Sequence, residues 1–524
     1  MFSASSRDGG LSKSPEPLTI TRAWPSRQAF LECLVGLLER AQEAARDYVN
    51  TSPVLSVSDQ VPGKNGHPLS WSFDFDLKDL CVLAAIIQAP LALRGATDRG
   101  KTYLAAHVLS GLFGPQGKGW WRIEVNRGIT IDDLIDVDVG KLSKSKLSEA
   151  MSSAAWVSLP AILLDEVNRA HAKLINLLLH VVDGSGLNVR GDLAIPIGLP
   201  YLAGGQQKRY SLSILTANDL GADTPGVYDE DAALMRRVVL AYNLDQAPVT
   251  THDVAQLTRA SAKRAKTEPP VYQSLAESII RVYESLPDTV PWSALTRLFL
   301  HYLWGLGCCI RTRTGRLRKD LIPRICSACH LSKAHPFCGK VGGLSEGLLQ
   351  FCREAAMGIA ALRKAKMLQA ARGECLHGRA AAIQDCLGSR AEGEELYAAF
   401  AEICARDLTV KGEDVISAYS LLAPGHLWIA RDFIESQPAY EKSEAYAFSD
   451  IATRSWQTMR GMLRKHEHLF SELAENGEVS PAHQAEVEAL ITTEDAAMLA
   501  VIAAFRDKDL GVRFDQALRP EKAA

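Results

Sequence analysis

The sequence lacks a long apolar run, an excess of charge of one sign and a dense set of cysteines. The longest apolar stretch, residues 81–93, contains Gln88 and Pro90 and is too short to cross a bilayer. The formal net charge of −3, from 58 basic and 61 acidic residues, gives no overall attraction to DNA or to an anionic membrane, although a local basic patch stays open. Eleven cysteines in 524 residues exclude a disulfide scaffold, and residues 1–10 lack the apolar segment of a secretory signal. We expect no membrane span and a reducing cytoplasmic location.

The length exceeds that of one ordinary domain. At about 150 residues per domain, 524 residues suggest three to four units. A helical pattern follows an N-cap at Ser26, and the Pro- and Gly-rich residues 51–70 are typical of a linker. We therefore expect four parts: an N-terminal extension over 1–70, an α/β core over 71–250, a helical domain over 251–430, and a helical tail over 431–524.

The expected core alternates short apolar runs with helical patterns, which favours a parallel, helix-covered α/β sheet. Its predicted strands cover 90–94, 121–125, 161–164, 211–216 and 238–242. The third is wholly apolar, and we expect it to be central. Beyond residue 250, Ala-rich amphipathic patterns predict helices over 272–286, 293–306, 344–370, 379–405, 412–423, 445–475 and 480–505.

A glycine-rich segment after the first strand matches the pattern G-x4-G-K-[ST]. In such a segment backbone N–H groups wrap the phosphates of a nucleotide, and the helix that follows adds partial positive charge. The lysine then reaches the β- and γ-phosphates, and the hydroxyl binds Mg²⁺. The sequence therefore predicts a nucleotide site built from Gly95, Ala96, Thr97, Asp98, Arg99, Gly100, Lys101 and Thr102.

Polar residues flank three later strands of the expected sheet: they follow the third and the fourth strand and precede the fifth. Asp165 and Glu166 end the third strand, where Asp165 is placed to hold Mg²⁺ and Glu166 to act as the base toward an attacking water. Asn218 ends the fourth strand, as a contact to that water or to the γ-phosphate, or as an ordinary turn residue. Arg236 and Arg237 precede the fifth, as a solvated basic pair or as arginines that reach a neighbouring subunit's γ-phosphate.

The order of these motifs resembles that of the AAA+ ATPases, and the local sequences around them resemble those of the MoxR-like group. Residues 165–170 are similar to D-E-[IV]-N-R-A, and residues 177–184 follow at the family's spacing. Residues 126–134 resemble the stretch after the family's second strand. Residues 233–238 resemble A-x-L-D-R-F, which makes Arg237 the better candidate for an arginine finger. The resemblance extends over 76–250 and, more loosely, over 340–427.

The resemblance implies a P-loop NTPase core with a helical lid, ATP and Mg²⁺ as cofactors, and hydrolysis at Glu166, Asn218 and a neighbour's Arg237. It further implies a homo-oligomeric, hexameric ring that acts as a chaperone or activase on a protein client, such as a partner with a von Willebrand A domain. The sequence departs from the family at three places. Glu346 and Gly347 occupy the position of the family's lid arginine. Residues 363–407 are an insertion in the lid. The hairpin expected over 196–210 is long.

A cysteine-rich segment follows the second lid helix. Its spacing C-x2-C-x5-H-x2-C suits a structural zinc ion. Cysteines in a helical domain are, however, more commonly free and buried. The candidate ligands are Cys326, Cys329, His335 and Cys338. A basic run over 311–324 lies just before it and keeps two alternatives open: a solvated or inter-subunit face, or phosphate-backbone contacts. The second would make the chain a nucleic-acid-linked AAA+ motor, as in restriction or phage defence.

The departure at Glu346 keeps a third function open. A chain with the fold but without the lid arginine can act as a non-hydrolysing nucleotide-binding scaffold. The presence of Lys101, Asp165 and Glu166 argues against that reading, because a scaffold does not need them all.

Overall fold

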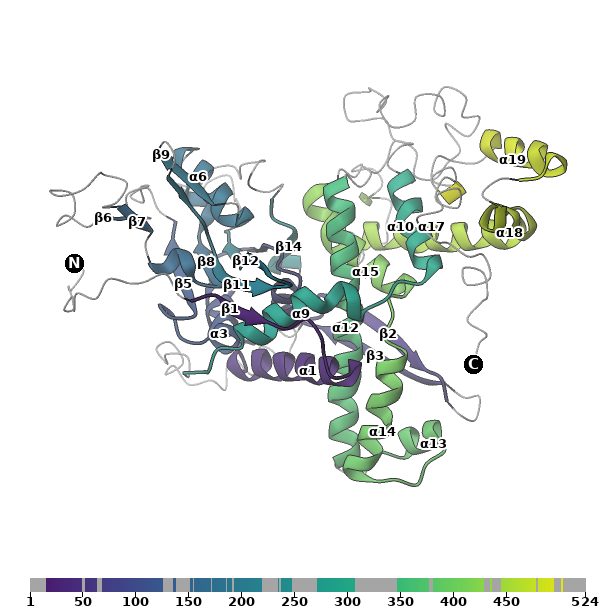
Figure 1. Ribbon diagram of the computed structural model, residues 1–524, viewed down its shortest axis with the longest axis horizontal. Coiled ribbons are helices and arrows are strands. Elements are labelled where there is room, and N and C mark those ends of the chain that lie inside the picture. Colours follow the sequence, from purple (N-terminus) through teal and green to yellow (C-terminus); the bar gives the residue numbers. More distant parts are fainter. Residues whose placement is uncertain are drawn as a thin grey trace.

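The centre of the molecule is a five-stranded parallel sheet in the order β14-β4-β13-β8-β5 (Figure 1). Its strands are β4 (Leu91–Arg94), β5 (Trp120–Glu124), β8 (Ala161–Asp165), β13 (Leu212–Thr216) and β14 (Leu240–Asn243). The expected α/β class and all five expected strands are confirmed. The computed structural model describes residues 16–49, 52–63, 68–125, 135–137, 151–153, 155–170, 172–184, 186–190, 193–218, 234, 237–246, 271–306, 346–376, 380–427, 434–435, 444–476, 479–493 and 501–502.

The interior strands β8 and β13 are buried on both faces of this sheet, which explains why they lack polar alternation. Successive residues of a strand point to opposite faces. In β8, Ala161 and Leu163 belong to one apolar core, whereas Ile162 and Leu164 belong to the other. The first core includes residues of α3 (Lys101–Phe113), and the second includes residues of α6 (Ala172–Asp183). The third strand was expected to be central; it is an interior strand, between β13 and β5, and all of its residues are buried.

The expected linker over 51–70 is wrong, because this segment forms most of an antiparallel hairpin. Strands β2 (Leu55–Val61) and β3 (Leu69–Phe75) pair along their whole length. Val57, Asp59 and Val61 are buried and alternate with exposed residues, the period of a strand with one covered face. The flanking prolines and glycines hid this pattern. Helix α1 (Arg27–Ala44) begins as predicted, since the Ser26 side chain accepts a hydrogen bond from the Ala29 amide.

The remaining strands form small sheets. The hairpin expected over 196–210 is confirmed as β11 and β12, with Gly204 and Gly205 at its tip, and β1 pairs with it in parallel. Buried Glu284 anchors this sheet, because it accepts hydrogen bonds from Tyr201 (2.6 Å) and Lys208 (2.9 Å). The bounds of these strands are β1 (Leu18–Ile20), β6 (Ile135–Val137), β7 (Met151–Ser153), β9 (Leu187–Arg190), β10 (Leu193–Ile195), β11 (Leu199–Ala203) and β12 (Gln206–Tyr210).

Helices dominate the rest of the described chain. Two expected helices are each divided: 379–405 breaks at Gly388, whose left-handed backbone (φ 56°) ends α13, and 445–475 breaks at His466. None of the described helices is long and apolar enough to cross a membrane. Their bounds are α2 (Leu77–Ile86), α9 (Ala276–Thr289), α10 (Ala294–Leu306), α12 (Glu346–Leu376), α13 (Ala381–Leu387), α14 (Gly393–Arg406), α15 (Gly412–His426), α17 (Glu444–Lys465), α18 (Glu467–Asn476) and α19 (Pro481–Thr493).

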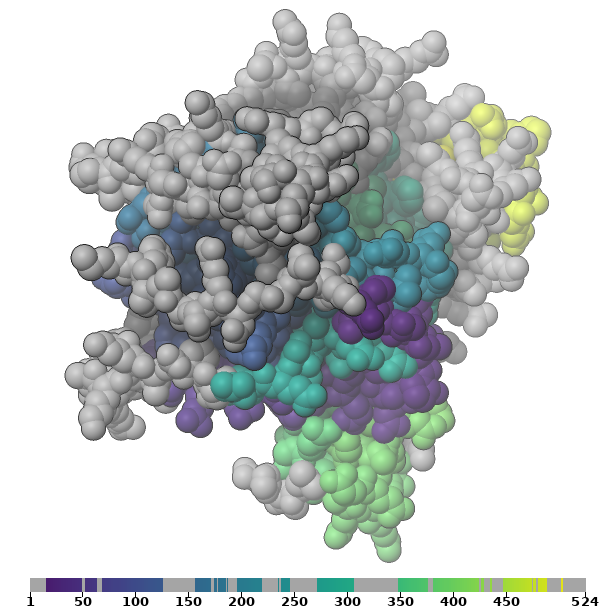
Figure 2. Space-filling view, turned by 60° about the vertical axis from the view of Figure 1, so that its left-hand side comes forward, coloured from purple at the N-terminus to yellow at the C-terminus, as the bar shows by residue number. Residues whose placement is uncertain are grey.

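Helix α12 joins the helical part to the rest. It crosses α2 so closely that a Cβ atom at Gly358 would lie 2.6 Å from Leu83 and 2.9 Å from Ile87. Residues 363–407, expected as an insertion, include the second part of α12 and the whole of α13 and α14. This green arm projects beyond the purple N-terminal region in both views (Figures 1 and 2).

A buried ionic cluster lies where this arm begins and ends. Arg363 donates to both carboxylate oxygens of Asp414 (2.9 Å each) and pairs with Asp59 of β2. Lys364 pairs with Asp59 (2.8 Å) and with Asp407 (2.5 Å). The side chains of Arg363, Lys364, Asp59 and Asp414 are at most 1% exposed. The N-terminal hairpin is therefore tied to the base of the arm.

Candidate nucleotide site

The glycine-rich segment forms the turn between β4 and α3, as the motif requires. Gly95 (φ 133°), Asp98 (φ 66°) and Gly100 (φ 74°) all have positive φ, a region that glycine enters without strain. A Cβ atom at Gly100 would lie 3.1 Å from the Tyr48 ring. The loop exposes Ala96 and Thr97 to solvent directly before the helix begins at Lys101. These features suit a loop whose backbone approaches a ligand closely.

Lys101 is fixed beneath this loop. Its ammonium group donates hydrogen bonds to the carbonyl oxygens of Gly95 (2.6 Å) and Ala96 (2.7 Å), and the residue is only 6% exposed. A buried ammonium group needs such partners, because desolvation otherwise destabilises its charge. The loop therefore holds a positive charge where the phosphates of a nucleotide would lie.

Asp165 is the centre of the site. One of its carboxylate oxygens accepts hydrogen bonds from Thr102 (2.7 Å) and Thr216 (2.5 Å). The other accepts two from Arg122 of β5 (2.6 and 3.1 Å). Thr102 and Asp165 were predicted to meet, and the structure brings them together. The contacts of Thr216 and Arg122 with Asp165 were not predicted, because each contact depends on which strands are neighbours in the sheet.

The oxygens of Thr102 and Asp165 fit the magnesium ion that the motif implies. Mg²⁺ prefers hard oxygen ligands and keeps several waters, so one hydroxyl and one carboxylate, with the phosphates of a substrate, are a usual donor set. Both side chains lie at the start of α3 and the end of β8, at one edge of the sheet. In this structure Arg122 supplies the positive charge beside Asp165.

Glu166 lies in a strained conformation next to Asp165. Its backbone is left-handed (φ 58°), which costs a non-glycine residue free energy and is often found at functional sites. Its N–H donates to the Thr216 hydroxyl (3.0 Å), and its half-exposed carboxylate pairs with Arg169 (3.1 Å). The carboxylate is thus turned away from the apolar strand and remains accessible.

Asn218 and Arg237 were also predicted as site residues. The backbone oxygen of Asn218 accepts a hydrogen bond from Asn168 (2.8 Å), which ties the ends of β8 and β13 together. Arg237 pairs instead with Asp183 at the end of α6 (2.5 Å), and both side chains are partly exposed.

Asp245 was missed by the sequence analysis. It follows β14, the edge strand beside β4, and accepts hydrogen bonds from the Ala96 amide (2.7 Å) and from Arg99 (3.0 Å). Tyr48 of the N-terminal part also reaches the loop, donating to the Arg99 carbonyl oxygen (3.4 Å). Asp245 lies two residues after β14, which pairs with β4 in parallel. Because parallel strands end at the same edge of a sheet, an acid just after a later strand is a sequence signal that could have pointed to Asp245.

The predicted zinc ligands Cys326, Cys329, His335 and Cys338 and the basic run 311–324 lie outside the described residues. Within the described ranges, no group of three or more His, Cys, Asp or Glu side chains could hold a metal ion. The cysteines described there are free thiols, and burial raises the pKa of Cys352 to about 12.

Of three comparisons with known proteins, the one with solved structures found similarity. No protein-family model matches the sequence, and no curated protein matches it. Among solved structures the chain is similar to a "putative ATPase" from Cytophaga hutchinsonii, with a TM-score of 0.47 and 11% sequence identity over 81% of this chain and 96% of that one. The phosphate-binding loop between β4 and α3, at the edge of a parallel sheet, is the arrangement of a P-loop NTPase.

Proposed function

We propose that this chain is a Mg²⁺-dependent ATPase of the AAA+ class, and more finely of the MoxR-like group. The observation that carries the proposal is the hydrogen bond between Thr102 and Asp165, with the strained Glu166 beside it. A binding-only loop needs no accessible carboxylate next to the metal position, whereas hydrolysis needs a base there.

Each residue has a separate role in the proposed reaction. Lys101 and the loop amides bind the phosphates, and Thr102 with Asp165 would hold the metal ion. When bound, Mg²⁺ neutralises charge on the β- and γ-phosphates. Glu166 orients the attacking water and accepts its proton, because its carboxylate is partly exposed at the same strand end. Asn218, at the end of β13, is the proposed polar contact to that water or to the γ-phosphate.

The proposal extends to assembly and client. Arg237 is partly exposed and pairs with Asp183, and by the family resemblance it is the candidate arginine finger for a neighbouring subunit. A homo-oligomeric ring, a hexamer by the family resemblance, would place it there. We propose a protein client, with a von Willebrand A domain protein as the partner class, and a cytoplasmic location that suits the free thiols.

Steady-state ATP hydrolysis tests the catalytic role. Lys101→Ala is expected to abolish nucleotide binding, whereas Glu166→Gln is expected to keep binding and to lower kcat by about 10²- to 10⁴-fold. Glu402→Gln, at an exposed glutamate of α14, is the matched control and should leave kcat unchanged. An assembled wild type that binds ATP but shows no turnover would contradict the ATPase and favour a nucleotide-binding scaffold.

Mixed oligomers test the trans role of Arg237. Lys101→Ala and Arg237→Ala are each expected to be inactive alone. Mixing them should restore activity, because a Lys101→Ala subunit still supplies its arginine to a neighbour whose loop is intact. If the mixture stays inactive while both variants assemble, Arg237 does not act across a subunit boundary.

A further inference from the structure

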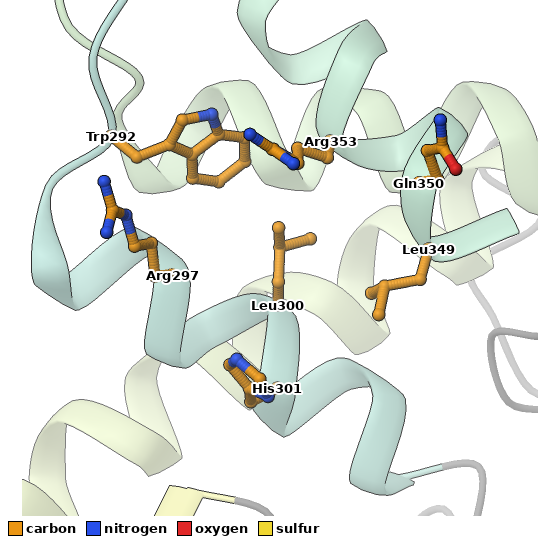
Figure 3. Close-up of a pocket in the computed structure, with 7 residues that line it drawn as sticks. All are labelled: Trp292, Arg297, Leu300, His301, Leu349, Gln350 and Arg353. Carbon is orange, nitrogen blue, oxygen red and sulfur yellow. The ribbon is translucent and has the colours of Figure 1, made fainter. Parts of the chain in front are cut away.

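A cavity of about 480 Å³ lies between α10 and α12, outside the nucleotide site (Figure 3). Helix α10 contributes Arg297, Leu300 and His301, spaced by three and four residues, which is one face of a helix. Helix α12 contributes Leu349, Gln350 and Arg353, again one face. Two helix faces thus form the walls, and the volume lies in the range of small-molecule sites.

Trp292 closes one end of this cavity and is held there by its backbone. It forms a bridge with Val410, and the carbonyl oxygen of the preceding Pro291 accepts hydrogen bonds from the Val410 amide and the Thr409 hydroxyl (3.0 Å each). The loop before α15 therefore fixes the indole ring relative to α10. The cavity is lined by elements that packing positions, not by a free loop.

Arg297 and Arg353 are both exposed, and no carboxylate among the described residues forms an ion pair with either of them. The described lining residues include no acid. Glu354, next to Arg353 in the chain, is an acid whose pKa is raised by burial, although the hydrogen bond that it accepts from Gln350 (3.1 Å) and the charge of Arg353 both lower it. Some exposed arginines elsewhere in the described chain, such as Arg406 and Arg454, do pair with carboxylates.

The two guanidinium groups and the two leucines lie in different parts of the cavity. Figure 3 shows the guanidinium groups of Arg297 and Arg353 on either side of the Trp292 ring, with Leu300 and Leu349 further along. The buried indole Nε1–H of Trp292 has no hydrogen-bond partner among the described residues. A matching ligand therefore has an anionic group at one end and a flat apolar body.

We propose that this cavity binds a small aromatic phosphate monoester. Two guanidinium groups match the charge of a phosphate monoester, close to −2 at neutral pH, better than that of a single carboxylate. A flat ring packs against indole and guanidinium faces and covers the two leucines. The ligand is of nucleoside monophosphate size, and it contacts no residue of the proposed ATPase site.

Calorimetry with 1-naphthyl phosphate tests the proposal. The full-length chain carries Lys101→Ala, so that phosphate binding at the P-loop does not contribute. We expect saturable binding, weakened at least tenfold by Arg297→Gln and by Arg353→Gln. Arg390→Gln, at an exposed arginine outside the cavity, should leave the affinity unchanged. Circular dichroism confirms that each variant is folded.

Two further ligands sharpen the result. 1-Naphthol lacks the phosphate and inorganic phosphate lacks the ring, and both should bind at least tenfold more weakly. AMP binding with the same dependence on Arg297 and Arg353 would identify nucleotides as the source of the ligand, whereas its failure beside 1-naphthyl phosphate would identify another aromatic phosphate. Absence of saturable 1-naphthyl phosphate binding, or binding indifferent to both substitutions, would overturn the proposal.

Discussion

Two aspartates, Asp59 and Asp165, are each buried and each contact a guanidinium group, yet their surroundings differ. Two of the three partners of Asp59 are as buried as it is: Arg363 is 1% and Lys364 0% exposed, whereas Lys411 is 17% exposed. Asp165 meets two hydroxyl groups and Arg122, whose side chain is 36% exposed. A buried partner cannot leave without a large desolvation cost, whereas a half-exposed one can move into water.

The difference in the exposure of their partners separates a structural ionic cluster at Asp59 from a cluster at Asp165 in which the partner can be exchanged. At Asp59 three cations, Arg363, Lys364 and Lys411, pair with one carboxylate and join β2 to the base of the 363–407 arm. At Asp165 the partners are those that a metal ion could replace, since Arg122 has a second carboxylate, Glu124, at 3.0 Å. The following predictions test this contrast.

Removing a partner from the buried cluster should have the largest effect. Asp59→Ala leaves Arg363 and Lys364 buried with fewer acceptors, and we expect a loss of about 3–5 kcal/mol in the free energy of unfolding. Urea unfolding followed by intrinsic fluorescence measures it. Arg406→Ala, which breaks an exposed pair with Glu402, is the control and should cost under about 0.5 kcal/mol. A loss below about 1 kcal/mol for Asp59→Ala would show that the cluster is not structural.

Removing the guanidinium at Asp165 should instead change metal binding. We expect Arg122→Ala to tighten Mn²⁺ binding up to about tenfold, about 1.4 kcal/mol, because the second oxygen of Asp165 becomes free. Electron paramagnetic resonance of Mn²⁺ with a non-hydrolysable ATP analogue measures this affinity. Arg454→Ala, on α17, should leave it unchanged. Unchanged or weaker Mn²⁺ binding by Arg122→Ala would show that Arg122 does not compete with the metal.

The smallest expected effect is a pH dependence where α15 meets β14. Burial lowers the pKa of His426, although its contact with the Val238 carbonyl oxygen (2.6 Å) raises it, and Arg94 lowers it further. A depressed pKa contributes stability above the unfolded value of about 6.5, and this contribution is lost as pH falls through the folded value.

Between pH 7.5 and 5.5, the wild type should therefore lose up to about 1 kcal/mol that His426→Asn does not lose. Urea unfolding at the two pH values gives the difference, and His468→Asn, at a more exposed histidine of α18, should behave as the wild type. Equal pH dependence of the His426→Asn variant and the wild type would exclude His426 as the titrating group.

Local features of the sequence were predicted well. The phosphate-binding loop, the five strands and the N-cap of α1 depend on residues that are neighbours in the chain, so a short segment contains the whole signal. The hairpin of β2 and β3 was missed because its prolines and glycines indicate a linker, although its buried face alternates with period two. Asp245 was missed for another reason: its partner Ala96 lies 149 residues away.

The sequence by itself determined the chemistry of the nucleotide site, because the motif fixes which groups stand at the start of one helix and at the ends of specific strands. Only the tertiary structure decided what surrounds those groups. The neighbours of a strand depend on the order of the sheet, which brings Arg122 to Asp165, and the burial of Asp59 depends on a helix more than 300 residues further along the chain. Pairing and burial are long-range properties, and they separate the exchangeable aspartate from the structural one.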